Sequence, residues 1–352
     1  MTNFLKKLFD SLKALVKDGV WPAILGLVLL LSLLATGITL GNETANQEPL
    51  EPAKMAFSLV IFLLTLIVII GVPAIGLRLR AKVGDLSFPQ TFTTILVSGL
   101  AMVAVAIPAL GWAMLVGEIK FEYWFNTLGT VKAEVWVLAL LVALAQTAFK
   151  KEAGAAAASL GLISLLTFGP LIALGITSLL PGTKQQVDTR TILWPEKATD
   201  EVDPATGYPK NPECSSGVST TRIVAPLHLA WPALQINPVV LVSESVGADV
   251  ISWTDNQYDY PNPHVNASDA LGGIVLAERA MQLAAEPKIV IDECKNLEIF
   301  GTPYINNGMS STDPEALLKN TKSGYLTGLT GQGIMLALTT VGWFVIRRTR
   351  KN

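Results

Sequence analysis

The chain has 352 residues, of which 51% are hydrophobic and 15% are charged, and its net charge at pH 7 is −2. Its mean hydropathy is +0.47. This composition excludes collagen-like, disordered, coiled-coil and disulfide-dense secreted proteins. The lack of a basic excess also excludes a chain-wide surface for nucleic acid. The class that remains is an integral membrane protein.

The first eighteen residues alternate apolar and basic side chains at helical spacing. The apolar residues fall on one face, while Lys6, Lys7, Lys13 and Lys17 lie elsewhere. Residues 1–18 are therefore predicted to form an amphipathic helix in the membrane interface. Such a helix either attaches to anionic lipid or a cytoplasmic partner, or only leads the chain into its first span.

Six apolar segments approach or exceed the roughly 20 residues that a membrane-spanning helix needs. They cover residues 19–42, 55–77, 86–117, 135–149, 155–180 and 323–346. The fourth is short, so we expect it to begin near Val131, with Lys132 and Glu134 at the interface. The first is long for a signal peptide and lacks a clear cleavage site, which favours an uncleaved anchor. The predicted fold is an α-helical integral membrane bundle of about six transmembrane helices, five of them within residues 19–181.

The charges of the short loops predict the orientation of the chain. One set of loops and termini holds thirteen cations and four acids, and the opposite set holds three cations and six acids. Lys and Arg resist translocation, so the first set is expected in the cytoplasm. Both termini, including the basic tail 347–352, are then cytoplasmic in a plasma (inner) membrane. Residues 182–322, between the fifth helix and the sixth helix at 323–346, are expected outside.

The segment 182–322 is predicted to be an α+β extracytoplasmic domain. It holds ten cations and eighteen acids, as suits a hydrated surface. Residues 181–237 are rich in proline and polar residues, which indicates loops and short edge strands. A helix capped by Ser268 is expected from Asp269 to about Ala285. Alternation and β-branched residues predict three strands, at Val239–Val246, Asp249–Trp253 and Lys288–Asp292.

Both cysteines of the chain, Cys214 and Cys294, fall in this outer segment. An oxidising compartment favours a disulfide between them. The alternative is a pair of unlinked buried cysteines. A metal site is less expected, because no C-x-x-C or histidine-rich spacing accompanies them.

The sequence offers little that resembles catalytic or transport machinery. No acid, base or histidine lies in the middle of a predicted span, which argues against an ion-coupled transporter. In the outer segment a polar stretch brings together Asp255, Asp259, His264 and Asp269, which suggests a hydrolytic or metal site. A surface turn explains the same residues. We expect no catalytic residue, cofactor or metal.

Glycines mark one face at the start of the sixth helix. Gly324, Gly328 and Gly331 are spaced so that they share that face, and glycine permits the closest approach of a neighbouring helix. The partner is either another helix of the same bundle or a second subunit.

These observations leave three classes of function. The first expectation is a structural or accessory subunit of a larger membrane assembly, with the outer domain as its interaction module. Its partners would be the lipid bilayer and other membrane protein subunits, with no nucleic acid. The alternatives are a transporter or channel component, and a membrane-anchored enzyme whose site lies in the outer domain.

Overall fold

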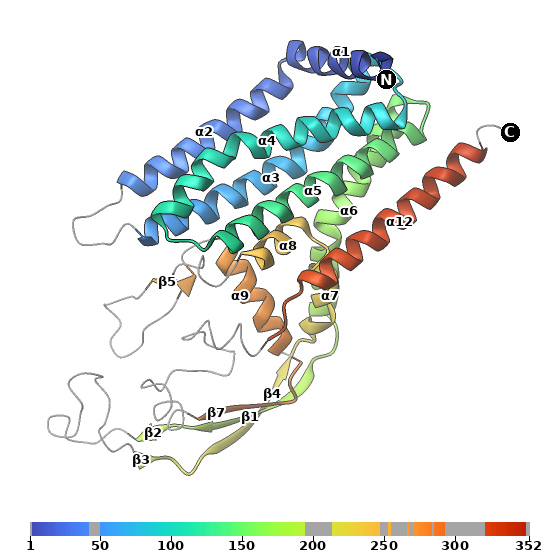
Figure 1. Ribbon diagram of the computed structural model, residues 1–352. Helices are drawn as coiled ribbons and strands as arrows, with labels where there is room; N and C mark the ends of the chain where they lie inside the picture. Colours follow the sequence, from blue (N-terminus) through green and yellow to red (C-terminus); the bar gives the residue numbers. More distant parts are fainter. Residues whose placement is uncertain are drawn as a thin grey trace.

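Figure 1 shows the computed structural model, in which long helices lie side by side and short strands gather beyond one end of them. The structure describes residues 2–41, 50–193, 213–246, 253–254, 266–267, 270–283, 285–292 and 321–349. Within these ranges, six helices are long and apolar enough to cross a membrane, in agreement with the six predicted apolar segments. They are α2 (Val20–Gly41), α3 (Leu50–Val83), α4 (Phe88–Val116), α5 (Phe121–Ala148), α6 (Glu152–Ser178) and α12 (Tyr325–Thr349).

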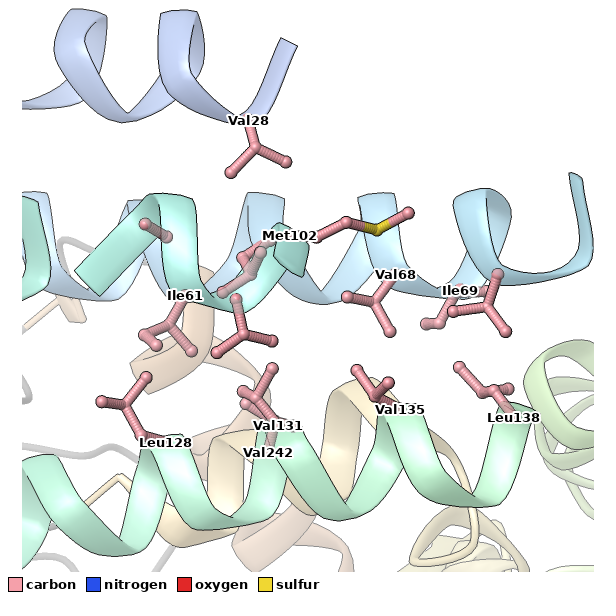
Figure 2. Packing of buried hydrophobic residues seen from close by; sticks show 14 of the residues in the cluster. Val28, Ile61, Val68, Ile69, Met102, Leu128, Val131, Val135, Leu138 and Val242 are labelled. Carbon is pink, nitrogen blue, oxygen red and sulfur yellow. The ribbon is translucent and has the colours of Figure 1, made fainter. Parts of the chain in front are cut away.

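The hydrophobic core lies between α3, α4 and α5. Figure 2 shows Ile61 and Val68 of α3 facing Val131 and Val135 of α5. Met102 of α4 packs toward α3, where a Cβ on Gly71 would lie 2.9 Å from its Cε. Helices pack closely here, and a Cβ on Gly99 of α4 would lie 2.6 Å from Cγ1 of Val135. Helices α2, α6 and α12 lie around this centre, and many of their large apolar side chains are exposed, as the surface of a bundle in lipid requires.

The basic turns gather at one end of the bundle. The amphipathic helix α1 (Thr2–Asp18) ends at Gly19, whose φ of +80° suits glycine and allows the chain to turn into α2. Asp18 binds Nζ of Lys82 at 3.0 Å, and Arg80 donates to the backbone carbonyl of Phe149 at 2.8 Å, which ties the α3–α4 and α5–α6 turns together. Both described ends of the chain lie at this end, which we call the basic end (Figure 1).

The strands lie beyond the opposite end of the bundle (Figure 1). Strand β1 (Thr183–Arg190) runs antiparallel to β4 (Val218–Val224) and parallel to β7 (Lys288–Asp292). The predicted strand at 288–292 is therefore confirmed. The expectation of loops and short edge strands over 181–237 is met by β4, which lies at an edge of this sheet, but is wrong for β1, which is its central strand. Cross-strand pairing supplies the order that the polar composition of β1 does not indicate. Two small two-stranded pairs complete the strands: β2 (Ile192–Leu193) with β3 (Glu213–Cys214), and β5 (Trp253–Thr254) with β6 (Asn266–Ala267).

Three helical pieces follow β4 along the chain, and the last of them covers the predicted strand Val239–Val246. They are η1 (Leu227–Leu229), α7 (Trp231–Leu234) and α8 (Pro238–Ser245). The predicted strand Val239–Val246 is wrong, because Asn237 accepts a hydrogen bond from the Val239 amide at 2.8 Å and Pro238 occupies the first helical turn. A short apolar run does not distinguish a strand from a buried helix. Of the predicted strand 249–253, only Trp253 lies within the described residues.

Helix α9 (Ala270–Leu283) confirms the predicted helix, while its expected cap Ser268 lies outside the described residues. Val242 of α8 and Leu271 of α9 belong to the same hydrophobic cluster as the spanning helices. The helical part of segment 182–322 thus shares the core of the bundle. Residues 227–245, from η1 to the end of α8, are called the inserted segment below.

Candidate functional site

The inserted segment reaches into the bundle at the turn between α7 and α8. Nδ2 of Asn237 donates to the backbone carbonyl of Thr167 at 2.7 Å, and Thr167 lies far inside α6, eleven residues before its end at Ser178. At a rise of about 1.5 Å per residue, this contact lies roughly 16 Å along α6 from that end. Irregular backbone at such depth is tolerated where protein surrounds it.

Glu134 lies at the same depth on α5. It is the fourteenth of 28 residues in that helix, and its side chain is 1% exposed. Oε1 accepts a hydrogen bond from Nε2 of Gln332 on α12 at 2.7 Å, whereas Oε2 is buried with no partner. The prediction that Glu134 lies at the membrane interface is wrong, because α5 begins at Phe121, ten residues earlier than expected. The prediction that no ionisable group lies in the middle of a span is wrong for the same reason.

The turn between α7 and α8 supplies a further polar group beside Gln332, since Nε2 of Gln332 also donates to the carbonyl of Ile236 at 3.2 Å. We define the Glu134 site as Glu134, Gln332 and the Ile236 carbonyl, with Gln235 as its neighbour along the chain. The Gln235 side chain is fully buried against Gly324 of α12, and neither its Oε1 nor its Nε2 has a hydrogen-bond partner. Buried polar atoms without partners, such as these and Oε2 of Glu134, are rare in folded proteins.

Polar side chains lead from the Glu134 site toward the end of the bundle that carries the strands. Thr127, Thr130 and Glu134 are spaced by three and four residues, so they share one face of α5, and all three are buried. Oγ1 of Thr127 donates to the Ser245 carbonyl at 3.2 Å, and Oγ1 of Thr130 lies 2.9 Å from the hydroxyl of Tyr325. We call these three residues the polar stripe of α5.

From Glu134 toward the C-terminal end of α5, the same face of the helix is apolar. Leu138, Leu141 and Val142 follow at helical spacing and are fully buried. The next buried polar side chain along α5 is Gln146, about 18 Å farther along the helix at 1.5 Å per residue, and its Nε2 donates to Oγ of Ser159 at 2.9 Å. The Glu134 site therefore has polar side chains on the side of the strands and apolar side chains on the side of the basic end.

The three glycines of the predicted packing face all lie against the inserted segment. A Cβ on Gly328 would lie 2.7 Å from Cδ1 of Leu241 and closer still to the Gln235 carbonyl. A Cβ on Gly331 would lie 2.5 Å from Cγ1 of Ile236, and one on Gly324 would overlap the Gln235 side chain. The glycine face thus contacts an element that the sequence did not reveal as a helix partner.

A second buried polar cluster joins α8, α9 and the residues before α12. Nη2 of Arg279 binds Oε2 of Glu244 at 2.5 Å, and Oγ of Ser323 donates to the same oxygen at 2.7 Å. Nε1 of Trp231 donates to Oε1 of Glu278 at 2.7 Å. Burial raises the pKa of Glu278 to about 9, and the neighbouring Glu244 carboxylate adds to the rise. Glu278 therefore holds its proton more tightly than an ordinary carboxyl group, beside the ion pair of Glu244 with Arg279.

The structure describes only some of the remaining predicted site residues. Asp255, Asp259, His264 and Asp269 lie outside the described residues, as does Cys294. Cys214 ends β3 opposite Ile192, and no free cysteine occurs in the part of the chain that the structure describes. Among those same residues, no group of three or more His, Cys, Asp or Glu could hold a metal ion.

In comparisons with known proteins, no family model, no curated protein and no solved structure matches this chain. The site is therefore interpreted from its own chemistry. Sequence reasoning missed Glu134 and Gln235 as site residues. The spacing of Thr127, Thr130 and Glu134 is the signal that could have placed Glu134 within a helix, whereas nothing in the sequence brings residue 235 to α12.

Proposed function

We propose that this protein is a cation-coupled membrane transporter or channel component, with Glu134 as the group that binds the cation. The observation that carries the proposal is the buried carboxyl group in mid-helix with one oxygen unpartnered. An ionised carboxylate left there alone costs several kcal/mol, on the order estimated for buried charges. A bound cation removes that cost, and we propose that this cation is a proton.

We propose that the cation reaches Glu134 from the strand end of the bundle, because its surroundings are polar on that side. The polar stripe of α5 carries hydroxyl groups there, and Leu138 and Leu141 lie on the other side. In many transporters broken helices bring backbone carbonyls to the binding site, and here the turn between α7 and α8 brings the Ile236 carbonyl to Gln332. The expectation of an accessory subunit rested on the absence of such an ionisable group.

Labelling with a hydrophobic carbodiimide tests the proposal at the residue itself, because the reagent attacks protonated carboxyl groups in apolar surroundings. We expect mass spectrometry of the full-length protein in mild detergent to find the adduct on Glu134. We expect Glu134→Gln to lose it and Glu122→Gln, an exposed acid in the first turn of the same helix, to keep it. Protection by Na⁺ at constant pH would identify sodium as the bound cation in place of the proton.

Flux measurements decide whether binding serves transport. We expect proteoliposomes under a potassium diffusion potential to show a proton flux that Glu134→Gln abolishes and Glu122→Gln retains. Absence of both proton and ²²Na⁺ flux in the wild-type protein would reject the transport proposal. The accessory-subunit and outer-domain-enzyme interpretations would then be the ones left to test.

The same proposal includes the orientation of the chain. Cations of α3, of the α5–α6 turn and of α12 come together at the basic end, and the positive-inside rule favours the cytoplasm for that end. We propose a plasma or inner membrane, with both termini cytoplasmic and residues 190–320 outside. Accessibility labelling of a cysteine at position 200 from the cytoplasmic side would contradict it.

We also propose a disulfide between Cys214 and Cys294. The support is that the chain has only two cysteines and that residue 214 lies with the strands, at the end of the bundle proposed to be outside. The chain-entropy model gives about 4 kcal/mol of stabilisation for closing a loop of roughly 80 residues. Intact-mass measurement after alkylation without reductant tests it, and two alkylated thiols in the native protein would contradict it.

A further inference from the structure

At the basic end of the bundle, a charged cavity and an apolar groove meet beside α12. The cavity has a volume of about 180 Å³ and lies between the α3–α4 turn, the end of α5 and Arg347 of α12. The groove has a volume of about 380 Å³ and lies between α5, α6 and α12. Phe149 lines both, so the two hollows adjoin.

The cavity is cationic. Arg80, Lys150 and Arg347 line it, against one carboxylate, Asp85. Arg80 is fixed there because its Nη2 donates to the carbonyls of Phe149 and Lys150 at 2.8 and 2.7 Å. Those carbonyls position the guanidinium without cancelling its charge. Asp85 lies 3.2 Å from the same nitrogen but is 81% exposed, so water screens much of its effect.

The groove is lined almost entirely by hydrocarbon. Small residues form its floor, among them Ala145, Ala158 and Gly342, and Leu165 at its rim is exposed. A Cβ on Gly342 would meet nothing within 4 Å, which shows that the space beside it is open. In a bilayer this groove opens toward the acyl chains.

Trp343, which lines the groove, and Arg347, which lines the cavity, are residue types that anchor helices at the membrane interface. Nε1 of Trp343 donates to Oγ1 of Thr147 at 2.9 Å, and the guanidinium of Arg347 lies 4.7 Å from the centre of the Trp343 ring. Tryptophan followed by basic residues is typical of the level where hydrocarbon gives way to headgroups. The groove thus lies at acyl-chain depth and the cavity at headgroup depth.

We propose that the cavity and groove together bind one anionic phospholipid, with its phosphate among Arg80, Lys150 and Arg347 and an acyl chain along the groove. Basic pockets between transmembrane helices at this level bind anionic headgroups. Charge complementarity selects the headgroup, and the open apolar groove supplies the second contact that a free phosphate lacks. The lipid would fill the space that α12 leaves as it diverges from α6 (Figure 1).

Native mass spectrometry of the full-length protein in mild detergent tests the proposal. We expect phosphatidylglycerol to bind and phosphatidylcholine with the same acyl chains to bind at least tenfold more weakly. Inorganic phosphate should not compete with phosphatidylglycerol. Equal binding of the two lipids, or displacement by phosphate alone, would overturn the proposal.

Matched charge variants locate the headgroup. The double variant Lys150→Gln with Arg347→Gln removes two cations that line the cavity. Lys151→Gln with Arg348→Gln removes the adjacent cations, which do not line it. A cation near anionic lipid contributes about 1 kcal/mol, or about fivefold in affinity, so the first pair should lower phosphatidylglycerol affinity by about thirtyfold. Equal loss in both double variants would overturn the assignment.

Filling the groove tests the acyl chain independently of charge. Gly342→Leu should weaken phosphatidylglycerol binding at least fivefold, while Gly333→Leu, which also adds its Cβ into open space, should leave binding unchanged. Unchanged lipid binding in Gly342→Leu, together with a change in the mass of the complex, would show that the groove accepts a helix of another subunit, and would reject the lipid.

Discussion

The two halves of α12 differ in what holds them to the bundle. In the first half, Gly324, Gly328 and Gly331 bring the helix backbone against the inserted segment, and Gln332 binds Glu134. In the second half, a polar contact between Trp343 and Thr147 lies beside an open groove. The same helix is thus tightly packed at the depth of the polar site and loosely packed at the basic end.

This difference follows from what lies between α12 and its neighbours. The inserted segment fills the space among α5, α6 and α12 around the Glu134 site, where it also binds the Thr167 carbonyl through Asn237. Among the described residues, no such segment lies near Trp343, and the groove there stays open. In a bilayer, close packing and hydrogen bonds provide the association between helices, because lipid is as apolar as leucine.

The largest expected effect comes from Gly328→Leu, which disrupts the close packing of the first half of α12 against the inserted segment. The new side chain would meet the Gln235 carbonyl and Leu241, and a backbone carbonyl has little room to move. We expect a loss of at least about 3 kcal/mol or failure to assemble, at the upper end for overpacking. Thermal unfolding in detergent measures it, with Gly333→Leu as the control that points into open space. Equal melting temperatures for Gly328→Leu and wild type would show that the glycine face is not a packing surface.

A pH-dependent change in stability is expected from Glu278, which belongs to the buried polar cluster next to the start of α12. Its folded-state pKa of about 9 exceeds the ordinary 4.5, so the folded protein keeps a proton that the unfolded chain releases. Stability should therefore be highest below pH 4.5 for this group and fall as pH rises toward 9, by up to about 1.4 kcal/mol per pH unit. Melting temperatures between pH 6 and 8 measure the slope.

Two variants assign that slope. Glu278→Gln should flatten it, because the amide is neutral at every pH and can still accept from Trp231. Glu286→Gln, at an exposed position, should leave it unchanged. If both variants keep the wild-type slope, Glu278 is not the group responsible.

A smaller effect is expected from Gln332→Leu. It removes the donor to Oε1 of Glu134 and leaves the buried carboxyl group without a hydrogen bond, at a cost of about 1–3 kcal/mol. The double variant Glu134→Leu with Gln332→Leu removes both polar groups and should recover much of that loss. A double-mutant cycle of thermal unfolding measures the coupling. Strict additivity of the two changes would show that the pair does not interact.

The smallest effect is expected in the loose half, from Trp343→Phe. This variant keeps an aromatic ring beside Arg347 and removes the hydrogen bond to Thr147, worth about 0.5–1.5 kcal/mol. Thr147→Val should have a similar effect, and the two together should cost no more than one. A loss as large as that of Gly328→Leu would contradict the view that this half is loosely held.

The candidate site was only partly visible in the sequence. Gln332 lies in an apolar span, where a polar residue indicates a hydrogen bond to another helix. Glu134 was assigned to the membrane interface because the charges at Glu122, Lys132 and Glu134 hid the true start of α5. Gln235 gave no signal at all, because its importance comes from its position against Gly324 and Gly328 and not from its neighbours along the chain.

The sequence by itself determined the number of spanning helices, since six long apolar segments have no other way to satisfy their backbone in lipid. It also determined the amphipathic first helix and the strand at 288–292, whose patterns are local. Only the tertiary structure decided that the helix at 238–245 lies inside the bundle and that Glu134 faces Gln332. These placements depend on contacts between residues 70 to 198 positions apart, such as Asn237 with Thr167 and Glu134 with Gln332, and no local pattern encodes such contacts.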